Sequence, residues 1–368
     1  MAGLYVGLIS GTSMDGIDAA LVRLESSRFE LIDALCVPYA PALAEHLRRV
    51  VASGSDLTIE SLAQLDVALG EAFARAALTL LERTRRTPGE IVAIGSHGQT
   101  VRHRPALDPP FTLQLGDANV IAARTGITTV ADFRRRDIAL GGQGAPLAPV
   151  FHAAVLADPS EYRVVANIGG IANLTLLRAD ATLTGFDTGP GNALMDAWFR
   201  AHRGDPYDRD GAWAGSGRVI EPLLSAMLAD PWLSQPPPKS TGVEHFNLRW
   251  LETHSPPVAT LEPADVAATL CELTARTMVQ SLREHASGCE RLLVCGGGAH
   301  NGTLMRRLAA LLPGVVVQST ADAGLHPDWV EASAFAWLAA QTLAGRPGND
   351  PAVTGARRAS VLGAIFPA

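Results

Sequence analysis

The chain lacks the features of several large protein classes. Its four cysteines form no CxxC pair and have no histidine at a zinc-like spacing, and Cys271 and Cys295 lie in apolar segments, so we expect buried free thiols. No apolar run reaches the roughly 20 residues that a membrane-spanning helix needs. The first nine residues have no basic start and read as a strand, not as a signal peptide. We therefore expect a cytoplasmic protein.

An excess of basic residues is also missing. Lys and Arg number 30 and Asp and Glu 37, which gives a net charge of -7, whereas nucleic-acid binding needs a basic surface. The residues that are present, 47% hydrophobic and 18% charged, are typical of a globular protein. At 368 residues the chain exceeds one typical core, so two domains are expected.

Strand-like and helix-like segments alternate along the chain, which predicts an α/β fold. A glycine hairpin near residues 4–24 is repeated in pattern near 164–177, and the strand at 91–94 is predicted to end in a turn at 95–100. The loop at 141–146, rich in Gly and Pro, reads as a hinge or domain junction, or equally as a long functional loop. The predicted helices are 59–81, 193–202, 266–285, 304–312 and 329–343. The predicted domains are 1–137 plus about 344–368, and 138–343.

Four glycine-rich turns stand at the ends of predicted strands. In open α/β sheets ligands bind there, because strand ends and helix N-termini present unpaired backbone N–H groups. In the first turn, glycines let the backbone approach phosphate oxygens, and Thr12 and Ser13 add hydroxyl donors. An ordinary tight hairpin would look the same. It is not a Walker loop, because no Gly-Lys-Ser/Thr follows.

The other three turns carry different residues. Asp187 lies inside a Gly/Thr loop, where it could act as a general base or hold magnesium-bound water; the alternative is a carboxylate that caps the next helix or stabilises a turn. The run 296–298 is a triple glycine against which an adenine or ribose could lie, although a permissive connector is the alternative. The turn at 169–170 could face phosphates.

This order of turns resembles the phosphate-1, phosphate-2 and adenosine segments of the acetate and sugar kinase, Hsp70 and actin superfamily. The resemblance is closer to the anhydro-N-acetylmuramic acid kinases of bacterial cell-wall recycling. It departs from hexokinase-type members, because Leu8 stands near the place of their early aspartate. The similar segments are 7–18, 96–100, 132–134, 141–147, 185–192, 238–246, 331–336 and 354–356.

The resemblance implies two actin-like (ribonuclease H-like) domains with a central cleft, and ATP and Mg²⁺ as cofactors. Its reaction opens the 1,6-anhydro ring of anhydro-N-acetylmuramic acid with water and phosphorylates O6. It implies catalytic roles for Asp187, as the base, and for Glu331, whose alternative is a helix-start charge. The ATP-binding residues that it implies are Gly11, Thr12, Ser13, Met14, Asp15, Gly16, Gly169, Gly170, Gly296, Gly297, Gly298 and Asn301. The substrate-binding residues are Asp18, His97, Arg134 and Asp187, and the metal ligands stay unassigned.

Two other functions remain open from the sequence. One is a sugar or acetate kinase that phosphorylates a free hydroxyl without opening a ring. The other is an actin- or Hsp70-like ATPase that binds a protein partner, although we expect no added partner-binding part beyond the last core segment. The expected partner is a small sugar, with no nucleic acid or membrane, and a homodimer is compatible with the sequence.

Overall fold

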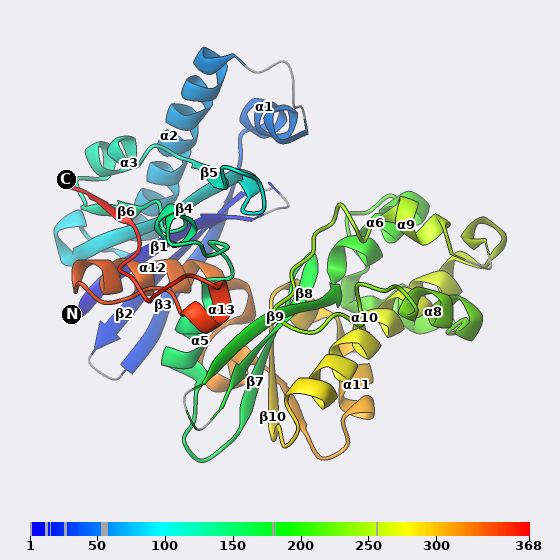
Figure 1. Cartoon of the computed structure of the whole chain (residues 1–368). Helices are drawn as coiled ribbons and strands as arrows, with labels where there is room; N and C mark the ends of the chain where they lie inside the picture. Colours follow the sequence, from blue (N-terminus) through cyan, green and yellow to red (C-terminus); the bar gives the residue numbers. More distant parts are fainter. Residues whose placement is uncertain are drawn as a thin grey trace. The chain divides into compact units, whose positions relative to one another are not determined.

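A computed structural model describes residues 2–11, 14, 16–25, 28–52, 58–178, 180, 182–254 and 257–368. The chain divides into two compact units (Figure 1). Unit 1 consists of Met1–Val155 and Trp329–Ala368, and unit 2 of Leu156–Asp328. Residues 138–155 and 329–343, which the sequence analysis assigned to the second domain, lie in unit 1, because Leu147, Val150 and the apolar side chains of 330–343 pack on its sheet.

The sheet of unit 1 has the strand order β12-β6-β4-β1-β2-β3, with β5 paired to β4. Strands β1, β2 and β3 form an antiparallel meander, and β4 and β6 run parallel to β1. The strands are β1 Gly3–Ser10, β2 Gly16–Glu25, β3 Arg28–Pro38, β4 Ile91–Arg104, β5 Phe111–Leu115, β6 Thr129–Ala131 and β12 Ala364–Phe366.

Helices cover both faces of this sheet. On one face Leu8 and Leu21 pack with Leu47 of α1 and Phe73 of α2. On the other, Tyr5 and its neighbours pack against α12. The helices of this unit are α1 Pro41–Ala52, α2 Ile59–Thr84, α3 Ala118–Thr125, α4 Arg135–Ala139, α5 Ala148–Leu156, α12 Val330–Leu343 and α13 Pro351–Thr354.

Helix α12 lies unusually close to the sheet, because two glycines face it from adjacent strands. A Cβ atom on Gly7 would overlap the carbonyl oxygen of Ala332, and one on Gly95 would overlap that of Phe335. Both overlaps are with backbone, which no rotamer change relieves. The two glycines therefore fix the height and position of α12, and with it Glu331 in the first turn of the helix.

Unit 2 repeats the strand order of unit 1. The order is β11-β10-β7-β8-β9, with β7, β8 and β9 antiparallel and with β10 and β11 parallel to β7. The predicted α/β class and the predicted repeat of the first half are both confirmed. The strands are β7 Arg163–Ile168, β8 Ile171–Leu177, β9 Leu183–Pro190, β10 Arg291–Cys295 and β11 Val316–Ser319.

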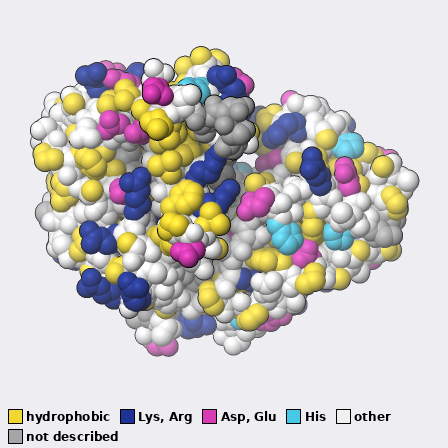
Figure 2. Space-filling view, turned by 45° about the horizontal axis from the view of Figure 1, so that its top comes forward, with side chains coloured by type: hydrophobic (Ala, Val, Ile, Leu, Met, Phe, Trp, Pro, Cys, Tyr) yellow, Lys and Arg dark blue, Asp and Glu magenta, His cyan; other side chains and the backbone are white. Residues whose placement is uncertain are grey.

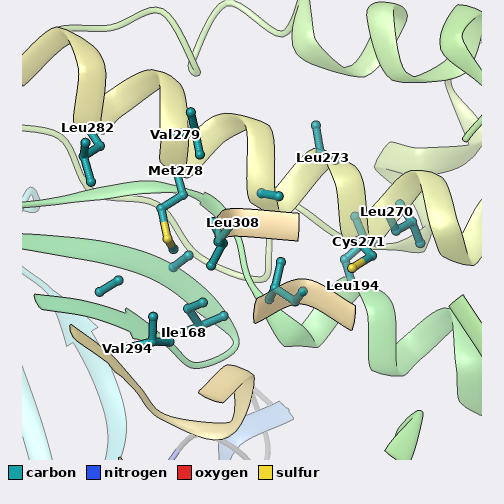
Figure 3. Close-up of a cluster of buried hydrophobic side chains, with 14 of the residues drawn as sticks. Ile168, Leu194, Leu270, Cys271, Leu273, Met278, Val279, Leu282, Val294 and Leu308 are labelled. Atoms are coloured by element: carbon teal, nitrogen blue, oxygen red, sulfur yellow. The ribbon is translucent and has the colours of Figure 1, made fainter. Parts of the chain in front are cut away.

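The core of unit 2 centres on the long helix α10. Figure 3 shows Met278 of α10 pointing toward Ile168 and Val294 of the sheet, with Leu282 and Leu270 to either side along the helix, all of them buried. The helices of unit 2 are α6 Asn192–Arg203, α7 Ala212–Ser216, α8 Glu221–Leu228, α9 Leu248–Glu252, α10 Pro263–His285 and α11 Gly302–Leu311. All five predicted helices are present, with ends within three residues of the prediction.

Two strands are longer than predicted. The expected turn at 95–100 is wrong, because β4 continues to Arg104 with His97 and Gln99 buried in it. The expected loop around Asp187 is instead part of β9. In both segments tertiary contacts bury polar residues that would otherwise favour a turn.

Three further observations concern the cysteines, membrane-spanning helices and the charge of the surface. Cys271 and Cys295 are buried free thiols, as predicted. No helix in the described ranges is long and apolar enough to cross a membrane. On the face drawn in Figure 2, coloured Lys and Arg side chains lie among acidic and hydrophobic ones, so this face is not a uniform basic surface.

Candidate active site

A row of polar side chains crosses three strands of unit 2. Asn167 of β7 pairs with Asn173 of β8, which pairs with Asp187 of β9. Because paired residues point to the same face of a sheet, all three share one face, and their neighbours Ile168, Leu174 and Phe186 belong to the core. All three polar residues are half-buried. The row is therefore a partly enclosed polar strip at the edge of an apolar sheet.

A β-bulge and a distant loop hold Asp187. The pairing of β8 with β9 shifts register between Ala172 and Asn173, and such bulges re-aim side chains. The backbone N–H of Thr241 donates to Asp187 Oδ2 at 2.9 Å, and the Ser240 hydroxyl donates to the same oxygen at 3.1 Å. Among the described residues no hydrogen bond reaches Oδ1. One carboxylate oxygen is thus anchored and the other is left for a ligand.

The surroundings of Asp187 shift its pKa in both directions. Burial raises the pKa of Asp187, while the Thr241 N–H, the Ser240 hydroxyl and the charge of Lys239 lower it, and the net change is upward. A carboxylate with a raised pKa is a better proton acceptor at neutral pH. The helix-capping alternative does not apply, since the hydrogen bonds of Asp187 go to the 239–241 segment and helix α6 follows Gly191 without a side-chain cap.

The loop that holds Asp187 is anchored on its other side. Lys239 Nζ donates to the Leu233 carbonyl at 2.8 Å and lies 4.6 Å from the ring centre of Trp232. The Lys239 carbonyl accepts from the Asp187 N–H at 3.1 Å. Lys239, Ser240 and Thr241 are not among the site residues predicted from the sequence, because nothing local links this segment to Asp187, which lies 53 positions before Ser240. They could have been found from their position in the segment 238–246, which resembles the family.

Three glycine turns of unit 2 meet beside this row. The Asn192 N–H donates to the Gly169 carbonyl at 2.7 Å, and the Asn192 side chain donates to Ile168. Cβ atoms on Gly296 and Gly298 would crowd Asn167 and Ile168. These two glycines are therefore needed for packing between turns.

Gly297 differs from its two neighbours. A Cβ atom there would meet only Asn192 Nδ2, at 3.1 Å. Gly297 lines a cavity of about 420 Å³ whose wall includes Met195, Phe199 and Trp213. Asn301 also lines the cavity, but its side-chain oxygen accepts from the Leu304 N–H at 3.0 Å and caps α11. The geometry offers a flat apolar recess next to the triple glycine.

Other candidate residues gather in unit 1. Arg134 Nε donates to His97 Nε2 at 2.9 Å, and Arg134 Nη1 donates to the Gly144 carbonyl at 2.8 Å. The His97 ring lies 4.6 Å from that of Phe335 on α12, one helical turn after Glu331. Burial lowers the pKa of Arg134 to about 10, opposed by the charges of Glu331 and Asp137. Arg134 is therefore still a cation at neutral pH, held in one orientation.

His97 supports Arg134 as a neutral ring. Since Nε2 accepts from Arg134, the proton is on Nδ1, which donates to the Gly98 carbonyl at 2.9 Å. Burial and the Arg134 charge both depress the pKa of His97 well below its usual value. Both ring nitrogens are thus engaged within unit 1, and a direct contact of His97 with substrate stays a prediction.

Glu331 is exposed to solvent at the start of α12. Although the side chain reaches solvent, many protein atoms surround the carboxyl group and partly desolvate it, which raises the pKa of Glu331; the positive charge of Arg134 opposes that rise. Within the part of the chain that the structure describes, no ion pair joins Glu331 to Arg134. Both groups are therefore available to a ligand.

The first glycine turn is described only in part. The Gly11 carbonyl accepts from Gln99 Nε2 at 3.3 Å, and Gly16 begins β2. Asp18 pairs with Ile9 across β1 and β2. Met14 has a positive φ of 53° and packs against the core that the sheet of unit 1 forms with α1 and α2. Thr12, Ser13 and Asp15 lie outside the described residues, so their predicted phosphate contacts stay predictions.

Asp137 was not selected from the sequence, yet it organises the Gly/Pro-rich loop. Its carboxylate accepts from the Gly144 N–H at 2.7 Å, from Asn349 Nδ2 at 2.6 Å and from the Thr354 hydroxyl at 2.7 Å. It is fully buried. These bonds tie loop 141–147 to the C-terminal segment and hold the Gly144 carbonyl that binds Arg134.

Comparison with known proteins decides the family. Residues 3–368 match the model of the anhydro-N-acetylmuramic acid kinase family. The chain belongs to this family. Two curated anhydro-N-acetylmuramic acid kinases, from Xanthomonas campestris pv. campestris strains 8004 and ATCC 33913, are each 56% identical over 368 residues, covering 99% of this chain and 97% of theirs.

Solved structures are more distant. The activator of the 2-hydroxyisocaproyl-CoA dehydratase from Clostridium difficile matches 91% of this chain and 93% of its own, with 12% identity and a TM-score of 0.45. Membership of the anhydro-N-acetylmuramic acid kinase family confirms the resemblance found in the sequence. The site residues predicted from the sequence divide between the units, with Asp187 and the triple glycine in unit 2 and with Arg134 and Glu331 in unit 1.

Proposed function

We propose that the chain is an ATP-dependent kinase that opens the 1,6-anhydro ring of anhydro-N-acetylmuramic acid with water and phosphorylates O6. The product is N-acetylmuramic acid 6-phosphate, in cell-wall sugar recycling. Family membership over residues 3–368 supports the kinase activity. The observation that carries the hydrolytic step is Asp187, a carboxylate with a raised pKa, one anchored oxygen and one free oxygen.

Asp187 serves as the general base in this proposal. It takes a proton from water, the water oxygen forms a bond to C1 of the sugar, and the C1–O6 bond breaks. The released O6 attacks the γ-phosphorus of ATP, and ADP leaves. Water is a poor nucleophile at neutral pH, so the base is essential to the first bond. The N–H of Thr241 keeps the carboxylate in place while its free oxygen faces the reacting water.

Magnesium is expected with ATP, and the residues present fit it. The described residues contain no cluster of three or more His, Cys, Asp or Glu side chains that could hold a metal. Mg²⁺ in kinases uses one or two carboxylates together with phosphate oxygens and water. The amide oxygens of Asn167 and Asn173 lie on the same face as Asp187 and would help to hold an ion that keeps its waters and binds the phosphates, while Asp187 keeps its free oxygen for the reacting water. When bound, Mg²⁺ neutralises phosphate charge.

Unit 1 supplies the proposed sugar contacts. Arg134 suits the lactyl carboxylate of the substrate, because its guanidinium is fixed by His97 and Gly144 and keeps further N–H donors. Glu331 is proposed to assist at the anomeric carbon. Because ATP is the phosphoryl donor, the cytoplasm remains the proposed location, and a homodimer remains a prediction.

An assay of ADP release over a sugar panel tests the function. We expect turnover with anhydro-N-acetylmuramic acid, and ¹⁸O from labelled water on C1 of the early product, before the anomers exchange. Label in released inorganic phosphate would mean that water attacks ATP. Turnover with free N-acetylmuramic acid and none with the anhydro sugar would instead select a kinase acting on a free hydroxyl.

A further inference from the structure

The cavity beside Gly297 has an apolar wall and several polar side chains. Met195, Phe199 and Trp213 line it together with Gly297. Flat aromatic and apolar surfaces suit the stacking of a nucleotide base. The volume of about 420 Å³ is in the range of small-molecule sites. Which part of a nucleotide binds here depends on the polar side chains of the cavity that are free to form hydrogen bonds.

Most of these polar groups are already engaged within unit 2. The Asp208 carboxylate accepts from the N–H groups of Trp213 and Ala214 at 3.0 and 2.9 Å. Asp210 accepts from the Gly302 N–H at 2.9 Å. The His300 Nε2 lies 2.7 Å from the Asp328 carboxylate. Asn192 and Asn301 are bonded as described above.

Asp196 is the exception among the described acidic residues of the cavity. It lies on α6, one turn after Asn192, and is half-buried. No hydrogen bond or ion pair within the described residues reaches its carboxylate. Burial raises the pKa of Asp196 to about 6, with Arg200 opposing and Asp208 adding to the rise. The group is therefore ionised at neutral pH and can only accept hydrogen bonds. Water can reach this half-buried carboxylate, but a ligand that covers it must supply hydrogen-bond donors in place of that water.

The chemistry of ATP offers two sets of donors. The Watson–Crick edge of adenine has one donor, the exocyclic amino group, next to the ring acceptor N1, which a carboxylate repels. The ribose has two neighbouring hydroxyl groups, and both can donate to one carboxylate. We infer that Asp196 binds the 2′- and 3′-hydroxyls of the ribose, with the base against the apolar wall near Gly297. This inference rests on the proposed function, since it takes the cavity as the nucleotide site.

Direct nucleotide binding by calorimetry, on the full chain without sugar, tests the inference. Asp196→Ala should weaken ATP binding about tenfold or more, the effect of losing hydrogen bonds to a charged group. Binding of 2′-deoxy-ATP and of 3′-deoxy-ATP, already weaker, should fall much less in the variant. Loss of negative charge alone would favour the polyanionic nucleotide, so charge cannot account for weaker binding. Asp205→Asn, at an exposed carboxylate outside this cavity, is the matched control and should bind all nucleotides as the unaltered chain does.

Other results would show whether the ribose contact, the nucleotide site or the proposed function is wrong. Equal losses for ATP and both deoxynucleotides, or no loss at all, would overturn the ribose contact. A changed preference between ATP and GTP, with the ratio of ATP to 2′-deoxy-ATP unchanged, would assign Asp196 to the base and also overturn it. Gly297→Val should weaken all nucleotides alike; unaltered affinity would show that the cavity is not the nucleotide site. The proposed function fails separately, if anhydro-N-acetylmuramic acid gives no ADP release.

Discussion

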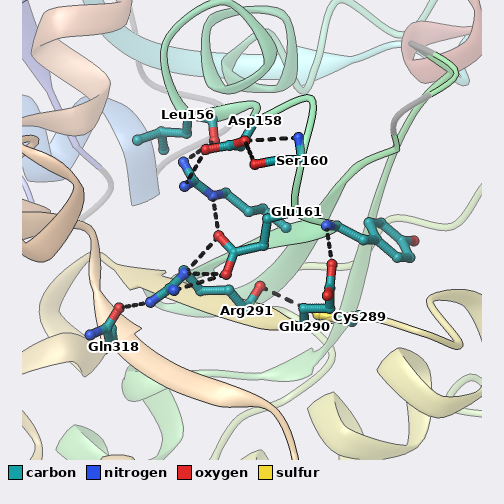
Figure 4. A network of polar contacts seen from close by, with 10 residues as sticks. Leu156, Asp158, Ser160, Glu161, Cys289, Glu290, Arg291 and Gln318 are labelled. Carbon is teal, nitrogen blue, oxygen red and sulfur yellow. Dashed lines mark hydrogen bonds and ion pairs between the residues drawn. The ribbon is translucent and has the colours of Figure 1, made fainter.

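Strands β7 and β10 carry charged side chains where they begin, whereas the polar row lies at the end of β7 and on the strands β8 and β9 beside it. At the beginning, Arg163 and Arg291 lie side by side in register, and Glu161 bonds to both, at 2.7 and 2.8 Å (Figure 4). Asp158 adds a bond to Arg163 at 2.7 Å, and Gln318 a bond to Arg291. Every charge of this network is matched by a partner from the protein itself.

The other end of the same sheet is different. Within the described residues, the side chains of Asn167 and Asn173 make no hydrogen bond, and Asp187 uses only one of its two oxygens. A half-buried polar group without a protein partner can still bond to water, so it costs less than the roughly 1–3 kcal/mol of a fully buried one, but it adds no stability. The first end therefore stabilises the fold, whereas the second gives up stability to keep donors and acceptors for a ligand. The comparison predicts opposite responses to carboxylate-to-amide substitutions at the two ends.

The largest effect is expected from Asp187→Asn. The amide keeps the shape of the side chain but cannot take a proton, and loss of a general base costs about 10²–10⁴-fold in kcat. Sugar affinity should change much less. Urea unfolding should show equal or slightly greater stability, since a desolvated charge is removed. Near-normal turnover would move the base elsewhere, with Glu331 the next residue to test.

The matching change at the other end is Glu161→Gln. It removes the charge that both arginines share, which should cost about 1–3 kcal/mol of unfolding free energy. The Arg291 and Arg163 hydrogen bonds lower the pKa of Glu161, so its stabilisation is present above the unfolded pKa and is lost as pH falls through the folded pKa. The variant should therefore lose less stability on acidification than the unaltered chain.

The kinetic readout of Glu161→Gln completes the comparison. We expect kcat and KM at 25 °C to be unaltered, because the network lies at the opposite end of the strands from Asp187. A large fall in kcat in the folded variant would contradict a purely stabilising role for this end.

The smallest effect is expected from Lys239→Met. Its positive charge lowers the pKa of Asp187, so removing it should raise that pKa further. Because the base must be deprotonated, the acidic limb of the kcat/KM profile should move to higher pH, with little loss on the plateau. Lys239→Arg keeps the charge and should leave the limb in place. An unmoved limb in the Met variant would mean that Lys239 does not influence the base.

The sequence predicted those parts of the fold and site that depend on local pattern. Alternating segments and the repeated hairpin indicated the α/β halves, and the glycine turns indicated where ligands bind. Ser240 and Thr241 could not be linked to Asp187, because the fold alone brings the two segments together. Helix α12 is apolar on most sides, so its sequence gave no sign of which sheet it covers.

The extension of β4 through residues 95–100 could not be predicted either, because it also depends on contacts with residues that are distant in the sequence. His97 and Gln99 are polar and lie next to glycines, which favours a turn, but inside the strand Arg134 bonds to His97 and the Gly11 carbonyl accepts from the Gln99 amide. Those partners lie far away in the sequence. The role of Gly95 was hidden for the same reason, since only the folded chain brings α12 against it.

The backbone contact of α12 with Gly7 and Gly95 limits how the family can diversify. A side chain at either glycine would force the helix away from the sheet, because the carbonyl oxygens of Ala332 and Phe335 fill the space where that side chain would begin. Phe335 in turn contacts His97, which bonds to Arg134. A displaced helix would therefore disturb the histidine and the arginine as well. Relatives with altered sugar preference should differ in the loop around Gly144 and keep glycine at both strand positions.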